Sequence, residues 1–342
     1  MPTQQHAAPT LRVWVALGIV YVVWGSTYLG IAIAIETMPP FLMLALRFAI
    51  AGSLLLGWEL LRNGRAILPT RREVRDSAIV GALLLGIGNG FVAFGEQTIH
   101  SGIAAILIAL MPVWLAVLGW VYFRDRLPKI VILGVGVGLA GVVLLIWPFG
   151  GGIVFDGLGI AALILSPVGW SHGSLFAARR AQLPKQALVA TALQMLFGSA
   201  FLFLEGVVTG ELGRFHPDAI SLRSLVALVY LISIGSMLAF NAYAWLLRHA
   251  PLSLIGTYAY VNPVVAVALG AIFLAEPISA RTLIASAVIV AAVAMIVTAR
   301  SRMSGAAAEA ETPEEAVRAE SEAGASDSGV NLRLDPRRGS PG

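Results

Sequence analysis

The feature that most constrains this chain is a run of about 20 apolar residues that recurs from the N-terminal region to residue 299. A helix of about 20 residues spans the hydrocarbon core of a bilayer, which is about 30 Å thick. Hydrophobic residues make up 58% of the chain and charged residues 12%, whereas ordinary soluble domains carry about 25% charged residues. The sequence therefore predicts an all-α protein that crosses a membrane many times.

Charged residues and Pro or Gly breaks divide the apolar sequence into ten predicted transmembrane helices, each long enough to cross with some tilt. The first run begins near Trp14 and ends at Glu36 without a small-residue cleavage site. We therefore expect it to remain as a helix rather than be removed as a signal peptide. The ten predicted ranges are 13–35, 40–61, 77–97, 102–123, 129–148, 157–178, 187–209, 222–247, 252–275 and 280–299.

The basic residues are distributed unevenly between the two sides of this predicted bundle. The loops of one side and the C-terminal tail hold 19 of the 23 Lys and Arg residues, the opposite loops hold three, and Arg47 lies inside a helix. Because basic residues near helix ends stay in the cytoplasm, we expect both termini there, with the protein in the inner membrane. This distribution explains the pI of about 9.7, so we exclude nucleic acid as a partner.

The composition changes after Arg302. Residues 300–342 are rich in Ala, Glu, Ser, Gly and Pro, with almost no large apolar side chains. Such a segment buries too little apolar surface to offset the entropy of ordering. We predict a disordered cytoplasmic tail over 300–342.

The two halves of the chain are similar to each other. Ser101 through Pro112 to Asp125 aligns without gaps, at an offset of 151, onto the segment from Leu252 to Glu276. Weaker matches pair residues 24–27 with 170–173 and residues 47–52 with 194–199. Each half contributes five predicted helices, and an odd number makes the second half enter the membrane from the opposite side. The sequence thus predicts a 5+5 inverted-topology repeat.

These motifs resemble the drug/metabolite transporter superfamily, with two tandem EamA domains. In both halves a mid-helix proline is followed by an acid, at Pro112 and Asp125 and again at Pro263 and Glu276, and this is similar to the signature of that family. Residues 39–52, 101–105 and 258–267 resemble its YedA-type subgroup of inner-membrane exporters. Asp125 is a departure, because the family usually has Glu there. The resemblance implies one domain at 12–149 and a second at 157–299.

The resemblance also implies a central cavity walled mainly by helices one to four and six to nine, with helices five and ten peripheral. It implies a secondary transporter that exports small metabolites, amino acids or drug-like compounds by alternating access, with protons as the suspected coupling ion. An importer and a passive channel are alternatives. An intramembrane enzyme is disfavoured, because the sequence has no HExxH motif, no Cys and no paired acids within its predicted helices.

Three titratable residues are candidates for the transport chemistry. Arg47 inside a predicted helix costs about 2.5–3.5 kcal/mol on insertion scales, so we expect it to face a cavity or a partner. It either holds a substrate carboxylate or tunes a nearby acid; the alternatives are a structural pairing with helix-end carbonyls and snorkelling. Glu96 and His172 are candidates for proton coupling. The alternatives are a wet carboxylate at a helix end for Glu96 and a structural hydrogen bond for His172.

Further candidates for the cavity wall are aromatic or polar residues near helix centres. Aromatic rings suit apolar substrates, although packing alone also explains them. Polar groups in lipid need hydrogen-bond partners, so we expect them to face inward. With Arg47 and His172, the candidate substrate-binding set includes Trp24, Ser26, Thr27, Asn89, Trp114, Trp170, Asn241, Tyr258, Tyr260 and Asn262.

We expect no cofactor and no metal. The glycine runs at 86–90 and 134–138 lack the Lys-Ser/Thr of a phosphate-binding loop, and close helix packing explains them better. The absence of Cys excludes disulfides and Cys-bound zinc. The expected partners are the lipid bilayer and a small-molecule substrate, with the protein a monomer or a homodimer.

Overall fold

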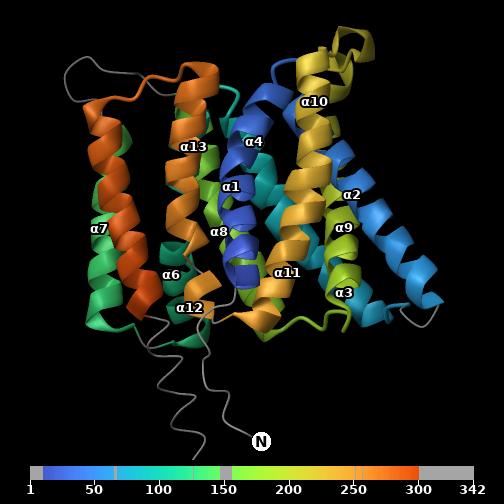
Figure 1. Ribbon diagram of the computed structural model, residues 1–342, viewed down its shortest axis with the longest axis horizontal. Helices are drawn as coiled ribbons and strands as arrows, with labels where there is room; N and C mark the ends of the chain where they lie inside the picture. The colour runs from blue at the N-terminus through green and yellow to red at the C-terminus, as the bar shows by residue number, and fades with distance from the viewer. Residues whose placement is uncertain are drawn as a thin grey trace, which may run out of the picture. The chain divides into compact units, whose positions relative to one another are not determined.

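The computed structural model describes residues 11–64, 68–125, 127–146, 156–250, 252–255 and 257–299. These residues are almost entirely helical and include no β-strand (Figure 1). The predicted disordered tail at 300–342 lies outside the described residues.

Nine helices in the described part of the chain are long and apolar enough to cross a membrane. In the first half they are α1 (Leu11–Ala34), α2 (Pro40–Asn63), Arg71–Gly95, Ser101–Phe123 and α7 (Lys129–Ile146). In the second half they are α8 (Gly157–Arg179), α9 (Ala187–Val208), Leu222–Tyr243 and Ala280–Ala299. The remaining predicted span, the ninth along the chain, is divided into α12 (Leu252–Ile255) and α13 (Tyr258–Leu274). The all-α membrane fold with five spans in each half is confirmed.

The third span begins at Arg71 rather than at the predicted residue 77. The Thr70 hydroxyl accepts a hydrogen bond from the Glu73 amide, and the Glu73 carboxylate accepts one from the Thr70 amide. This capping box satisfies orphan donors at the helix start. The prediction was wrong here because charged residues that look like a loop form the first turns of α3 (Arg71–Gly81).

The third and eighth spans each contain an eight-residue π-helical segment. η2 (Ala82–Asn89) lies between α3 and α4 (Gly90–Gly95), and η5 (Leu231–Leu238) lies between α10 (Leu222–Tyr230) and α11 (Ala239–His249). π-Helical turns are rare and often occur at functional sites. Because η2 and η5 occupy corresponding positions in the two halves, the internal repeat extends to the details of the backbone.

The fourth and ninth spans are both interrupted near the proline of the repeated motif. In the fourth span, α5 (Ser101–Ile108) and α6 (Met111–Phe123) are separated by a two-residue turn. Pro112 has no N–H to donate to the carbonyl of Ile108, and Pro263 inside α13 has none for the carbonyl of Ala259. Each half thus carries a backbone carbonyl that its own helix does not satisfy through the usual bond.

Close helix contacts organise the bundle. α2 packs along α9, α1 packs against α13 and α11, and α8 packs against η2 and α4. α7 and the helix at Ala280–Ala299 lie side by side at one edge (Figure 1). A Cβ added at Gly134 or Gly141 of α7 would lie 2.7 Å from Ile296 or Ile289, respectively. These two glycines permit that contact. The packing interpretation of the run at 134–138 therefore holds for Gly134, whereas nothing lies within 4 Å of a Cβ added at Gly136.

Candidate substrate cavity

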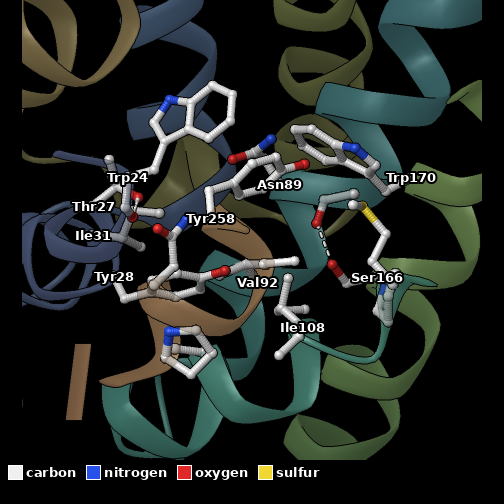
Figure 2. A pocket seen from close by; sticks show the side chains of 18 of the residues that line it. Trp24, Thr27, Tyr28, Ile31, Asn89, Val92, Ile108, Ser166, Trp170 and Tyr258 are labelled. Carbon is white, nitrogen blue, oxygen red and sulfur yellow. Dashed lines mark hydrogen bonds between the residues drawn. The ribbon is translucent and has the colours of Figure 1, made fainter. Parts of the chain in front are cut away.

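A cavity of about 120 Å³ lies between helices of both halves. Since one water needs roughly 10–15 Å³ by this kind of measure, the space holds several waters or a small organic group. Figure 2 shows side chains from α1, η2 and α8 converging on it. The wall also includes residues of α2, α5, α6, α11 and α13. No described residue of α9, which is the seventh span, is among the lining residues, so α9 lies behind the wall. The resemblance implied that this span would be part of the wall.

Seven of the predicted binding residues line this single cavity. They are Trp24, Thr27, Arg47, Asn89, Trp170, Tyr258 and Asn262. They come from several different helices and from both halves of the sequence. The fold therefore collects distant candidates at one place, although their role in substrate binding stays a prediction.

Aromatic rings form much of the wall. Trp24 lies with its ring centroid 5.1 Å from that of Tyr258 and 5.5 Å from that of Phe240, both in edge-on contacts. Tyr28, one turn along α1, and Trp170 of α8 also line the space (Figure 2). Edge-on aromatic contacts are favourable and hold the rings in defined orientations. The cavity thus presents rigid apolar surfaces to a ligand.

Arg47 is the charged residue of the cavity wall, with only 3% of its surface exposed. Its Nε donates to the Ser236 hydroxyl of η5 at 2.9 Å, and its guanidinium lies 4.8 Å from the ring centroid of Phe48. Its Nη1 has no hydrogen-bond partner in the described part of the chain, and no carboxylate there lies within ion-pair distance. A buried cation with an open donor suits an anionic ligand.

Three further polar side chains of the cavity wall contact backbone carbonyls. The Asn262 amide nitrogen, in its satisfied orientation, donates to the carbonyls of Tyr21 and Tyr258 at 3.2 Å each. The Ser166 hydroxyl donates to the Gly88 carbonyl of η2 at 2.6 Å. The Asn89 amide reaches the Leu84 carbonyl only at 3.4 Å, which is a weak bond. Asn89 therefore retains most of its hydrogen-bonding capacity.

Five predicted binding residues do not line the cavity: Ser26, Trp114, His172, Asn241 and Tyr260. Ser26 is bonded to the Tyr230 hydroxyl at 2.5 Å and to its own helix. Asn241 donates to the Met237 carbonyl at 2.8 Å, one turn back. His172 contacts the Val168 carbonyl through Nδ1 at 2.9 Å and the Tyr122 hydroxyl through Nε2 at 3.0 Å. These bonds give Ser26, Asn241 and His172 partners outside the cavity wall, and their predicted roles stay predictions.

Glu96 follows α4 directly and lies outside the cavity wall, one turn beyond the lining residue Val92. It is 7% exposed, and neither carboxyl oxygen has a hydrogen-bond partner among the described residues. Burial raises the pKa of Glu96 well above its ordinary value, and the nearby Glu276 carboxylate raises it further. The structure places the predicted proton-coupling residue in a buried position rather than a wet one.

Several lining residues were not singled out from the sequence, among them Tyr28, Phe48, Ser166, Pro167 and Phe240. Ser166-Pro167 is a polar residue followed by a mid-helix proline, as is Asn262-Pro263. The serine could therefore have been singled out by this pattern. The three aromatic residues carry no such signal, because an aromatic residue in an apolar helix is equally compatible with contact to lipid, to the protein core or to a cavity.

Five helical spans in each half, with repeated backbone irregularities and a cavity lined from both halves, define a polytopic membrane protein of the transporter type. The chain belongs to the EamA-like transporter family, whose model matches residues 12–147 and again residues 157–298. The protein is therefore a membrane transporter.

Individual relatives agree with this assignment. The chain is 37% identical over 282 residues to the inner membrane transporter YedA of Escherichia coli (strain K12), covering 82% of this chain and 89% of that protein. It is 25% identical to a transporter of Archaeoglobus fulgidus, over 85% of this chain and 100% of that protein. A crystal structure with 22% identity superposes with a TM-score of 0.59 over 85% of this chain and 98% of that chain, which supports the fold.

Proposed function

We propose that this protein is a secondary transporter that exports small organic molecules bearing a carboxylate across the inner membrane by alternating access. The observation that carries the proposal is Arg47, which lines the cavity and whose Nη1 has no acceptor among the described residues. A substrate carboxylate would supply that acceptor through charge-assisted hydrogen bonds. The aromatic wall around Trp24 and Tyr258 would take the apolar body of the substrate.

The arrangement of the two halves supports alternating access rather than a permanent pore. Residues of both halves line one cavity, and inverted repeats of this kind move against each other around a fixed site. The uneven distribution of Lys and Arg supports cytoplasmic termini. We propose protons as the coupling ion, a monomer or homodimer as the working unit, and no catalytic step.

The test is counterflow of labelled substrates in vesicles reconstituted with the purified protein. A growth-protection screen of an overexpressing strain against amino acids, carboxylate analogues and cationic drugs would first narrow the substrate. Arg47→Ala and Asn262→Ala are expected to reduce transport while leaving membrane expression intact. Arg223→Ala is the matched control, because Arg223 is 54% exposed and pairs with Glu36 away from the cavity.

Two results would change the proposal. Unchanged flux in both cavity variants would remove Arg47 and Asn262 from the site. A steady ion conductance in planar bilayers would identify a channel, and uptake driven in the opposite sense would identify an importer.

A further inference from the structure

The end of the bundle at which the third span ends and the fourth begins holds two carboxyl groups from opposite halves of the chain. Glu96 follows α4 in the first half, and Glu276 follows α13 in the second. Val92, one turn before Glu96, lines the substrate cavity. The two carboxyl groups therefore lie at an end of the bundle that adjoins the cavity.

Glu276 holds the first turn of α5. Its carboxylate accepts hydrogen bonds from the Ser101 amide and hydroxyl at 2.8 Å each, and from the Gly102 amide at 3.1 Å. Amide groups at a helix start have no partner within the helix, so this carboxylate supplies what they lack. The contact joins the second half of the chain to the first and must break if the halves separate at this end.

Glu96 is in the opposite situation, because it is buried and its two oxygens have no partner among the described residues. It interacts electrostatically with Glu276 and with Tyr28, a cavity residue of α1. The other elements around α4 present Arg47 from α2, Glu205 of α9 near Gly90, and Asp156 at the start of α8. Asp156 already bonds Thr98 and the Gly159 amide, and none of these groups pairs with Glu96.

We propose that Glu96 is the proton-binding site of the transport cycle, and that its ionisation releases Glu276 from α5 and opens this end of the cavity. The inference rests on the proposed function for its place in a cycle. Neighbouring carboxylates repel each other, and here one is buried and the other partly buried, so loss of the Glu96 proton weakens the contact between Glu276 and Ser101. The proton passes from Glu96 to water in the substrate cavity while that cavity is open to the opposite face, and this end then opens.

The sign of the pH effect follows from burial. Because the closed form raises the pKa of Glu96, it is stabilised at low pH and loses that stabilisation as the pH rises through the raised pKa. The repeat counterpart of Glu276 is Asp125, which forms two hydrogen bonds with Arg179, at 3.1 and 2.7 Å.

The pH effect at Glu96 fits export. If the Glu96 end faces outward, a proton from outside binds after the substrate has left and closes the end behind it. Proton entry and substrate exit then alternate on one carrier.

The test uses the absence of native Cys in the chain. Ile108→Cys places one thiol in the cavity wall, and a membrane-impermeant maleimide is added to the face that bears Gln97. Gln97→Cys, at an exposed position beside Glu96, is the reference, because it corrects for the pH dependence of thiol reactivity itself. The labelling rate of the Ile108→Cys variant relative to that of the Gln97→Cys variant is measured from pH 5 to pH 9 without substrate.

We expect the relative labelling rate to rise by up to about tenfold per pH unit below the pKa of Glu96, as for release of one proton. In Glu96→Gln the relative labelling rate is expected to stay low at every pH. In Asp125→Asn this rate is expected to keep the native pH dependence. Glu276→Gln, or the milder Ser101→Ala, is expected to raise labelling at low pH. A native pH dependence that persists in Glu96→Gln, or relative labelling that never changes with pH, would overturn the proposal.

The labelling assay separates this inference from the proposed function. The assay needs no substrate. If Arg47 variants failed to affect transport, that result would contradict the binding of a substrate carboxylate at Arg47, but it would not change the result of the labelling assay.

Discussion

At the scale of single residues, Arg47 combines a cost to folding with a proposed role in substrate binding. Its burial leaves Nη1 unsatisfied, and replacing a poorly paired buried charge by an apolar side chain is often neutral or stabilising by about 1–4 kcal/mol. We therefore predict that Arg47→Met abolishes counterflow but does not lower the thermal unfolding temperature in detergent. Leu44→Ala, a fully buried change in the same helix, is the comparison and should cost about 2–5 kcal/mol. Equal destabilisation by both would mean that Arg47 is structural.

Glu211, in the connection after α9, is a second residue with a specific structural task. Its carboxylate accepts hydrogen bonds from the Phe41 and Leu42 amides at 3.3 and 2.9 Å, at the start of α2. We predict that Glu211→Ala lowers the free energy of unfolding by about 1–3 kcal/mol, because it leaves buried donors unpaired. Glu36→Ala is the control, since Glu36 forms only an exposed ion pair with Arg223 at 3.4 Å. Thermal scans in detergent would compare them, and equal stability of both variants would contradict the capping role.

The sequence located part of the cavity wall through one rule, that a polar group inside a membrane helix needs a partner. The rule placed Arg47, Asn89 and Asn262 correctly on the inner side of their helices. It does not separate them from Asn241, because an amide can also bond to a carbonyl one turn back in its own helix. Packing between helices decides whether a side chain lies on the face of its helix that is turned toward the cavity. A single sequence does not show this packing.

At the scale of elements, the contact between the third span and α9 depends on a glycine. A Cβ added at Gly81 would clash with the carbonyl oxygen of Gln194, a backbone atom that cannot move aside without shifting α9. We predict that Gly81→Ala lowers the unfolding temperature and transport together. Gly136→Ala in α7 is the matched control, since nothing lies within 4 Å of its added Cβ. If Gly81→Ala behaves like Gly136→Ala, the two helices are not in close contact there.

The spans themselves were predictable, whereas their internal irregularities were not. About 20 apolar residues must become a helix in lipid, since no water is present to satisfy the backbone. The π-helical turns of η2 and η5 have no residue pattern that distinguishes them from α-helix, so the sequence predicted uninterrupted helices there. Pro112 and Pro263 did indicate a disturbed backbone, but the position of each break depends on the neighbouring helices.

At the scale of the whole molecule, the inverted repeat makes a prediction about topology. Reporter fusions after residues 1 and 342 are expected to report the cytoplasm, because 19 of the 23 basic residues lie on that side. Fusions in the loop after α2 should agree with them, and fusions in the loop after α1 should report the opposite side. Termini on opposite sides, or an odd number of crossings, would contradict the arrangement.

The two halves repeat the same backbone irregularities but not in identical form. The fourth span breaks at Ala109 and Leu110, while its partner in the second half is divided between Ile255 and Tyr258, about one turn earlier in the shared alignment. Under the alternating access proposed above, the two halves exchange these shapes during the cycle. The exchange would present the same geometry to the opposite face of the membrane, so the difference between the halves outlines the reverse-facing state.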